Sequence, residues 1–245
     1  VVFVGGISPQ LEGEEMPIEI SGFKGGDRTN IELPKVQRNF LKALKEAGKK
    51  VVFVNCSGSA IALTPETESC DAILQAWYSG QEGGEAVARV LFGEYNPAGK
   101  LPITFYRNSN QLPDFKDYSM KGRTYRYMND ALFPFGYGLS YTSFRIGDAT
   151  LSNSILKKGE KITLKVPVSN VGKKDGTEIV QVYVKDPADT EGPLKSLKAF
   201  ERVEVKAGAT AQAVITLDSK NFELFDAATN TVRAKAGKYE VYYGS

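Results

Sequence analysis

The chain has 245 residues, a net charge of +2, no histidine and 42% hydrophobic residues. The near-neutral charge gives no electrostatic reason to expect nucleic acid or an acidic membrane as a partner, and no apolar run approaches the roughly 20 residues of a membrane-spanning helix. The lack of histidine excludes Ser-His-Asp and Cys-His nucleophile systems, histidine–zinc sites and acid/base chemistry on imidazole. Any catalysis must therefore use carboxylates, lysine, tyrosine or a cysteine that acts without histidine, and carboxylates are the best supplied of these.

The opening run VVFVGG (1–6) is apolar without alternation, which is typical of a buried parallel strand covered on both faces. A buried strand rarely opens a natural protein, and no initiator methionine or signal peptide precedes it, so we expect a segment of a longer polypeptide. The acidic stretch QLEGEEMPIEI (10–20) follows this strand. Its glutamates are either solvated loop charges or include a proton donor, and the carboxyl end of a strand is where ligands sit in open α/β sheets.

Strand-like and helix-like patterns continue to alternate after this stretch. Helices are predicted over 35–48, which follows Pro34, and over 83–93; further strands are predicted over 49–59 and 71–80. This rhythm predicts an open α/β sheet. One face of the first helix carries the apolar residues Val36, Phe40, Leu41, Leu44 and Ala47.

The two cysteines, Cys56 and Cys70, cannot form a metal site alone, and we expect neither a metal nor a cofactor. Cys56 follows a strand-like run and is predicted to be a buried small hydrophobic residue. A disulfide to Cys70 stays open, so the cysteine content leaves the redox compartment undetermined.

From about residue 145 the pattern becomes all-β. Runs such as ITLKVPV and IVQVYV alternate apolar and polar side chains, which implies strands with one buried and one wet face. About 100 residues with this rhythm predict a β-sandwich of the immunoglobulin or fibronectin type III kind. We therefore divide the chain into an α/β domain (1–144) and a β-sandwich (145–245). The aromatic, Pro- and Gly-rich stretch 95–144 is expected to pack across the domain junction.

Four stretches carry a family resemblance: GDRTNIELP, WYSGQEGGEAVARVLFGEYNPAGKLPITFY, RTYRY and FPFGYGLSYTSF. Their order and spacing resemble the consecutive signatures of glycoside hydrolase family 3. The opening VVFVGGISPQLEGEE, with GGDR further on, is most similar to the β-xylosidase branch, with β-glucosidases next. The resemblance implies the C-terminal portion of such an enzyme, namely a three-layer α/β sandwich domain, partly truncated, followed by an all-β fibronectin type III-like sandwich.

The same resemblance implies retaining hydrolysis of terminal non-reducing β-linked sugars, on an oligosaccharide (as in xylan degradation) or an aryl glycoside. An aspartate nucleophile would come from an N-terminal (β/α)8 barrel that this chain lacks, and a glutamate acid/base from this chain. Retention needs the two carboxyls about 5–5.5 Å apart, so the chain alone should be inactive. The resemblance also favours a periplasmic or secreted location in a bacterium, and leaves a homodimer open.

Three glutamates are candidates for the acid/base. Glu12 is the first, because it comes six residues after Gly6, the spacing that the resemblance to the xylosidase-type E-x-E motif implies; Glu14 is the second and Glu15 a distant third. An insertion before Asp27 and Arg28 departs from the shorter family pattern and leaves the choice between them open. In the family pattern, Arg28 of this Asp-Arg pair has one of two roles. It either braces the acidic loop or contacts the substrate.

Two aromatic residues on the third predicted strand are candidates for contacts to a sugar, because an aromatic face suits the apolar face of a pyranose. Trp77 is assigned to the core, and Tyr78 is kept as a candidate for substrate binding. The alternative to an enzyme fragment is a non-catalytic carbohydrate-binding module, or a structural module that stabilises its neighbours or mediates dimers.

Overall fold

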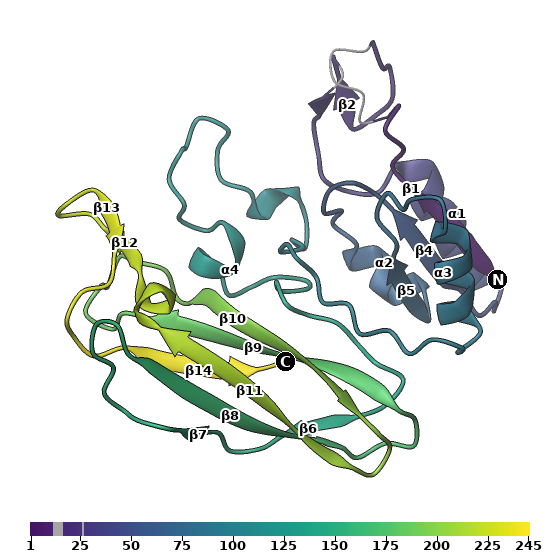
Figure 1. Cartoon of the computed structure of the whole chain (residues 1–245). Helices are drawn as coiled ribbons and strands as arrows, with labels where there is room; N and C mark the ends of the chain where they lie inside the picture. The colour runs from purple at the N-terminus through teal and green to yellow at the C-terminus, as the bar shows by residue number, and fades with distance from the viewer. Residues whose placement is uncertain (12–16, 26) are drawn as a thin grey trace. The chain divides into compact units, whose positions relative to one another are not determined.

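The structure, a computed structural model, describes residues 1–11, 17–25 and 27–245 (Figure 1). Contacts divide the chain into two compact units. Unit 1 consists of Val1–Leu91, Ile103–Thr124 and Met128–Phe135; unit 2 consists of Phe92–Pro102, Tyr125–Tyr127 and Gly136–Ser245. The aromatic stretch 95–144 is therefore shared between the units.

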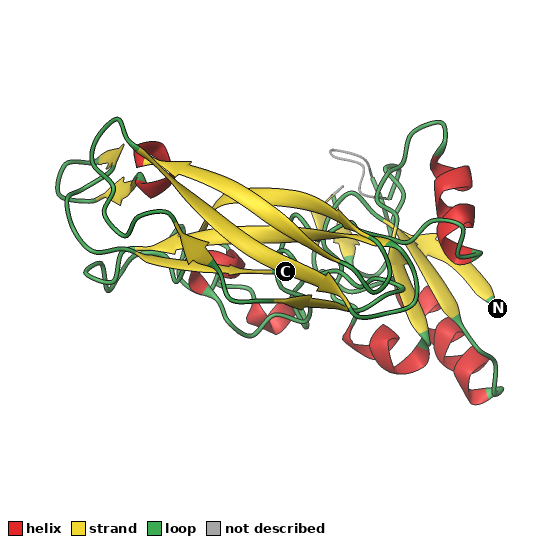
Figure 2. Ribbon diagram, turned by 60° about the horizontal axis from the view of Figure 1, so that its bottom comes forward, coloured by secondary structure: helices red, strands yellow, loops and turns green. Residues whose placement is uncertain are grey.

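Unit 1 is built on a parallel sheet with the strand order β1-β4-β5. Helices α1 and α2 pack against each other on one face of this sheet, and α3 lies on the other face (Figure 2). The predicted α/β class is confirmed, with helix α2 as an addition that the Pro at its first turn could have indicated. The bounds are β1 Val2–Gly6, α1 Lys35–Glu46, β4 Val52–Cys56, α2 Thr64–Ser69, β5 Ala72–Gln75 and α3 Gly83–Leu91.

The predicted burial of the first strand is wrong in part. Val2 and Val4 of β1 are each more than half exposed, because they point to the opposite face of the strand from Phe3, whose ring packs against Phe40 of α1. On α1, Leu41 is fully buried, whereas Val36 is largely exposed and Phe40 is about half exposed. Helix α1 contacts β1 through the rings of Phe40 and Phe3, whose centroids lie 5.5 Å apart.

Unit 1 also contains short elements outside this sheet. Strands β2 and β3 form a small antiparallel hairpin after the acidic stretch. A 3-10 helix, η1, follows later in the chain, and helix α4 runs from unit 1 into unit 2. The bounds are β2 Phe23–Lys24, β3 Asp27–Arg28, η1 Ser109–Gln111 and α4 Thr124–Tyr127.

Unit 2 is a β-sandwich, which confirms the predicted fibronectin type III-like fold. One sheet has the order β10-β9-β14 and the other β11-β8-β6, with β7 paired to β8. The bounds are β6 Phe144–Ile146, β7 Thr150–Leu151, β8 Lys161–Asn170, β9 Gly176–Lys185, β10 Ser196–Val205, β11 Thr210–Asp218 and β14 Glu240–Gly244. A 3-10 helix, η2 (Ser219–Phe222), and the hairpin β12 (Leu224–Asp226) and β13 (Thr231–Arg233) lie between the last of these strands.

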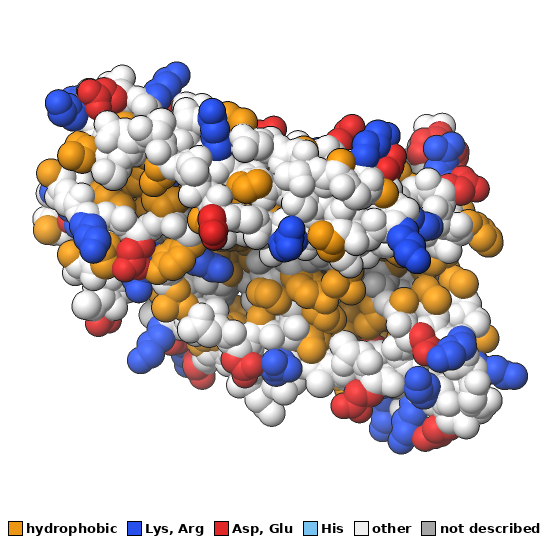
Figure 3. All heavy atoms as spheres, turned by 90° about the horizontal axis from the view of Figure 1, so that it is seen from below, with side chains coloured by type: hydrophobic (Ala, Val, Ile, Leu, Met, Phe, Trp, Pro, Cys, Tyr) orange, Lys and Arg blue, Asp and Glu red, His pale blue; other side chains and the backbone are white. Residues whose placement is uncertain are grey.

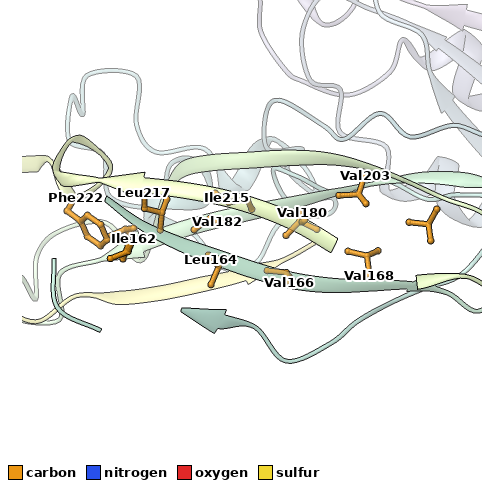
Figure 4. Close-up of a cluster of buried hydrophobic side chains, with 13 residues drawn as sticks. Ile162, Leu164, Val166, Val168, Val180, Val182, Val203, Ile215, Leu217 and Phe222 are labelled. Carbon is orange, nitrogen blue, oxygen red and sulfur yellow. The ribbon is translucent and has the colours of Figure 1, made fainter. Parts of the chain in front are cut away.

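The core of the sandwich comes from the alternation seen in the sequence. Every second residue of β8, from Ile162 to Val168, points inward and meets β9 residues such as Val182 (Figure 4). Each such side chain contributes about 1.5–3 kcal/mol when buried, so this row is the main source of the sandwich's stability.

The outer face of β9 is covered by the aromatic stretch that belongs to unit 2. Gln181 donates a hydrogen bond of 3.0 Å to the Gly136 carbonyl, and the Tyr183 hydroxyl donates to Gln181 at 2.6 Å. Gly136 has a φ of +83°, and a Cβ there would lie 2.2 Å from the Gln181 side-chain oxygen, so glycine is required at this contact. The stretch is thus packed onto the sandwich.

Charged side chains of both signs are interspersed on the face drawn in Figure 3. No helix among the described residues has both the length and the apolar composition needed to cross a membrane.

Candidate active-site edge of the α/β sheet

The carboxyl ends of β1, β4 and β5 lie at one edge of the unit 1 sheet, where ligands bind in open α/β folds. The predicted acid/base residues Glu12 and Glu14 follow β1, but both lie outside the described residues. The described part of this edge consists of the residues on either side of the acidic stretch and the residues that form hydrogen bonds with them.

The end of β1 is held in place by contacts on three sides. Gln37 of α1 accepts a hydrogen bond from the Gly6 amide at 2.8 Å and donates one to the Gly6 carbonyl at 2.7 Å. The amide of Ile7, a fully buried residue, donates to the Cys56 carbonyl at 2.9 Å. Gly6 has a φ of +123°, and a Cβ there would lie 2.0 Å from the Cys56 carbonyl oxygen, so this approach requires glycine.

Tyr78 supplies the third contact. Its hydroxyl donates a hydrogen bond of 2.6 Å to the Ile7 carbonyl, 71 residues away in the sequence. The predicted strand position of Tyr78 is wrong, because β5 ends at Gln75. The residue remains 42% exposed, so the hydroxyl anchors the start of the acidic stretch while the ring reaches solvent. A sugar contact by this ring stays a prediction.

Trp77 precedes Tyr78 in the same loop and has a φ of +60°, in the left-handed region. Such a backbone costs about 1–3 kcal/mol in a residue with a side chain, and it persists where surrounding contacts impose it. Here the indole packs edge-on against the buried ring of Phe105, with centroids 6.1 Å apart. The predicted core role of Trp77 agrees with this contact, although the residue is only partly buried.

A buried polar network that sequence reasoning missed lies beneath this edge. Asn55, at the end of β4, donates to the Gln75 side-chain oxygen at 2.6 Å and to the Ser57 hydroxyl at 3.3 Å. Gln75 donates to the same hydroxyl at 3.2 Å, and Ser57 donates to the Ser59 carbonyl at 2.9 Å. The sequence signal was the row of polar side chains at the end of an apolar strand.

Arg28 connects this network to the hairpin that follows the acidic stretch. Its Nη1 donates to the Ser59 hydroxyl at 2.9 Å and to the Ala60 carbonyl at 3.4 Å, and its Nε donates to the Asn30 carbonyl at 3.2 Å. The role of a brace, one of the two predicted for Arg28, fits these contacts. A contact to substrate stays a prediction.

Glu32 is a carboxylate whose pKa is lowered by its hydrogen bonds. Burial alone would raise its pKa, but hydrogen bonds from the hydroxyl and the amide of Ser109, at 2.6 and 2.8 Å, outweigh burial and hold the pKa below its ordinary value. A carboxyl that is ionised at neutral pH cannot donate a proton to a leaving group, so Glu32 is unsuited to the acid role.

The cysteines carry no disulfide, and both are free. The prediction that Cys56 is buried is wrong, since it is partly exposed, whereas Cys70 is buried. Within the described ranges, no group of three or more Cys, Asp or Glu side chains is arranged to hold a metal ion.

The fold and this edge together define a parallel α/β domain joined to a fibronectin type III-like sandwich, with an acidic stretch at the ligand-binding end of the sheet. Residues 1–141 match the family model "Glycosyl hydrolase family 3 C-terminal domain", and residues 178–245 match "Fibronectin type III-like domain". The chain belongs to glycosyl hydrolase family 3, where it corresponds to the C-terminal part.

Curated relatives support this assignment. The chain is 64% identical, over all of its 245 residues, to a xylan 1,4-beta-xylosidase of Xylanibacter ruminicola, of which it covers 28%. It is 39% identical over 235 residues to a periplasmic beta-glucosidase of Salmonella typhimurium, with 90% of this chain and 31% of the relative covered. The chain thus spans less than a third of the length of these relatives.

Solved structures agree with the fold. A beta-glucosidase from Listeria innocua in complex with glucose superposes with a TM-score of 0.81 at 28% identity, over 99% of this chain and 34% of the other. A beta-glucosidase from Erythrobacter marinus gives a TM-score of 0.83 at 32% identity, over 99% of this chain and 32% of the other.

Proposed function

We propose that the chain is the C-terminal portion of a retaining β-glycosidase that removes terminal non-reducing β-linked sugars, with xylose as the first choice and glucose as the second. The observation that carries this proposal is the 64% identity to a xylan 1,4-beta-xylosidase along the whole chain. The nucleophilic aspartate belongs to a (β/α)8 barrel outside this chain, so the chain alone is inactive.

In this mechanism the chain contributes the general acid/base, Glu12 or Glu14. The glutamate first protonates the leaving-group oxygen and later deprotonates the water that releases the sugar. It must be protonated before the first step, so a neighbouring cation would oppose its role. Arg28 donates hydrogen bonds to Ser59 and Ala60, in the turn after β4.

The contacts on both sides of the acidic stretch support a positioning role for the sheet edge. Tyr78 holds Ile7 before the stretch, and Arg28 holds the hairpin after it. The two anchors hold residues on either side of the stretch, Ile7 and the β2–β3 hairpin, at the same sheet edge. Proton transfer needs the acid placed to within about 0.5 Å of its productive geometry, and a firmly held sheet edge serves that need.

The test compares hydrolysis by this chain alone with hydrolysis by the chain joined to the barrel. In the joined protein, the acid's Gln variant (Glu12→Gln, or Glu14→Gln) should slow xylobiose hydrolysis roughly a hundredfold or more. The same variant should slow 4-nitrophenyl xyloside far less, since an activated leaving group needs little protonation, and azide should restore part of that rate. Glu19→Gln, in the same stretch, is the matched control and should behave like the unchanged protein.

Equal losses on both substrates would remove the substituted glutamate from the acid/base role. Activity of the chain without the barrel would contradict the division of the two carboxylates between different domains.

A further inference from the structure

Strand β1 ends in two consecutive glycines, Gly5 and Gly6, and neither position has room for a side chain. A Cβ on Gly5 would lie 2.5 Å from the side-chain oxygen of Gln37 and 2.5 Å from the ring of Phe3. Gly6 is buried and has a φ of +123°, a conformation that residues with a Cβ rarely adopt. The backbone of β1 therefore approaches Gln37 of α1 closely at the point where the strand ends.

The side chain of Gln37 takes the place of a neighbouring strand at Gly6. The next residue, Ile7, donates its backbone amide to the Cys56 carbonyl of β4 at 2.9 Å. Gly6 instead directs both of its backbone polar groups to Gln37, whose side-chain amide accepts from the N–H at 2.8 Å and donates to the C=O at 2.7 Å. A buried N–H and C=O left unpaired would be costly, so this double hydrogen bond determines where the end of β1 lies.

Helix α1 lies beside β1 and holds it at a second point, one turn further along the helix (Figure 1). Phe40 follows Gln37 by three residues, on the same face of the helix, and its ring packs against Phe3 with centroids 5.5 Å apart. The backbone amide of Gln37 donates to the Pro34 carbonyl at 2.9 Å, which places Gln37 in the first turn of α1. Because the helix backbone fixes the spacing of the two contacts, α1 positions both the middle and the end of β1.

We propose that Gln37 is a positioning residue for the general acid/base. Its two hydrogen bonds set the place and the direction in which the chain leaves β1, six residues before Glu12 and eight before Glu14. This inference rests on the proposed function, because it takes one of these glutamates as the proton donor. Gln37 acts through the backbone of Gly6 and not by contact with the substrate.

A positioning role predicts a particular pattern of kinetic loss. A misplaced acid slows the reaction most when the leaving group needs a proton, and least when the leaving group departs easily as an anion. A smaller fraction of folded enzyme lowers kcat/KM on every substrate by the same factor. The ratio of kcat/KM for two leaving groups therefore separates lost positioning from lost folding.

The test uses the chain joined to the barrel and two aryl xylosides of similar size, phenyl xyloside and the activated 4-nitrophenyl xyloside. Gln37→Met keeps the approximate length of the side chain and removes both hydrogen bonds. It should lower kcat/KM about tenfold or more on phenyl xyloside, but less than about threefold on 4-nitrophenyl xyloside. Gly5→Ala places a Cβ against the same amide and should shift the ratio in the same direction. If Gln37→Met does not fold, Gly5→Ala carries the test.

Gln111 offers a matched control, because its side chain also joins two backbone groups within unit 1. It accepts a hydrogen bond from the Arg107 amide at 2.6 Å and donates one to the Asp130 carbonyl at 2.7 Å, and neither residue belongs to β1. Gln111→Met should leave the ratio of the two kcat/KM values unchanged, even where it lowers stability.

An unchanged ratio in Gln37→Met would overturn the positioning role, and so would an equal shift in Gln111→Met. The proposed function fails by a different result, namely an unchanged ratio in the Gln variants of both Glu12 and Glu14. A shift with one of those glutamate variants and none with Gln37→Met would refute the role of Gln37 alone.

Discussion

The buried ion pair between α1 and α2 allows a quantitative prediction for unit 1. The Glu66 side chain of α2 is 1% exposed, and its carboxylate accepts hydrogen bonds from Arg38 Nε at 2.9 Å and Nη2 at 3.5 Å. Arg38, on α1, is 27% exposed, so the two partners lose different amounts of hydration when they pair.

The cost of breaking the pair depends on which charge is left behind. Removing one partner of a fully buried pair costs about 3–5 kcal/mol, because the other charge stays buried without compensation. Glu66→Gln leaves Arg38, which keeps part of its hydration, so we expect a loss of about 2 kcal/mol in the free energy of unfolding. Arg38→Met leaves the buried carboxylate and should cost more, about 3–4 kcal/mol.

The assay uses the chain's only tryptophan, Trp77, which lies in unit 1 and reports its unfolding in urea by fluorescence. The exposed pair of Glu85 and Arg89 on α3 is the control, and Glu85→Gln should change stability by less than about 0.5 kcal/mol. A smaller loss for Arg38→Met than for Glu66→Gln would refute the reasoning from desolvation. So would a loss for either that matches the control.

Two further predictions concern the cysteines and the β12–β13 hairpin. A thiol reagent at about pH 8 should label Cys56 in the folded chain and Cys70 only in urea, because burial raises the pKa of the Cys70 thiol to about 11; labelling of both at one rate would contradict this. Hydrogen bonds from Arg233 and Thr229 lower the pKa of Asp226 to about 2. Its folded-state pKa is below the unfolded value, so its stabilisation is present above about pH 4 and is lost as the pH falls toward 2. Thermal melts followed by circular dichroism should show a weaker acid dependence for Asp226→Asn, and an unchanged dependence would contradict the assignment.

The β-sandwich could be predicted from the sequence because its signal is local. Each long strand alternates apolar and polar residues, and that alternation determines which side chains face the core, as in β8 from Ile162 to Val168. The burial of Val4 and Phe40 could not be predicted in the same way. An apolar residue is buried only where another element covers it, and a run of valines does not indicate which element covers the face to which each valine points.

The sequence predicted where the candidate site lies in the chain but not the contacts that flank it. The rule that ligands bind at the carboxyl ends of parallel strands predicts a site in the acidic stretch, because that stretch follows β1 in the sequence. The contact between Tyr78 and the Ile7 carbonyl joins residues 71 positions apart, and it exists only because β5 ends at Gln75. No spacing in the sequence encodes such a contact, since it depends on strand order and on the positive φ of Trp77.

These contacts bear on how a glutamate in the acidic stretch could act as an acid. A proton donor on a surface loop loses catalytic efficiency when its position varies, because proton transfer requires a short and aligned hydrogen bond. The chain fixes Ile7 with Tyr78 on one side of the stretch and the β2–β3 hairpin with Arg28 on the other. Ile7 is bound by the loop after β5, and Arg28 is bound by the turn after β4. Both turns lie at the same sheet edge, so a movement of that edge would move both anchors together. The buried network of Asn55, Ser57 and Gln75 links those two turns and makes the edge a single support.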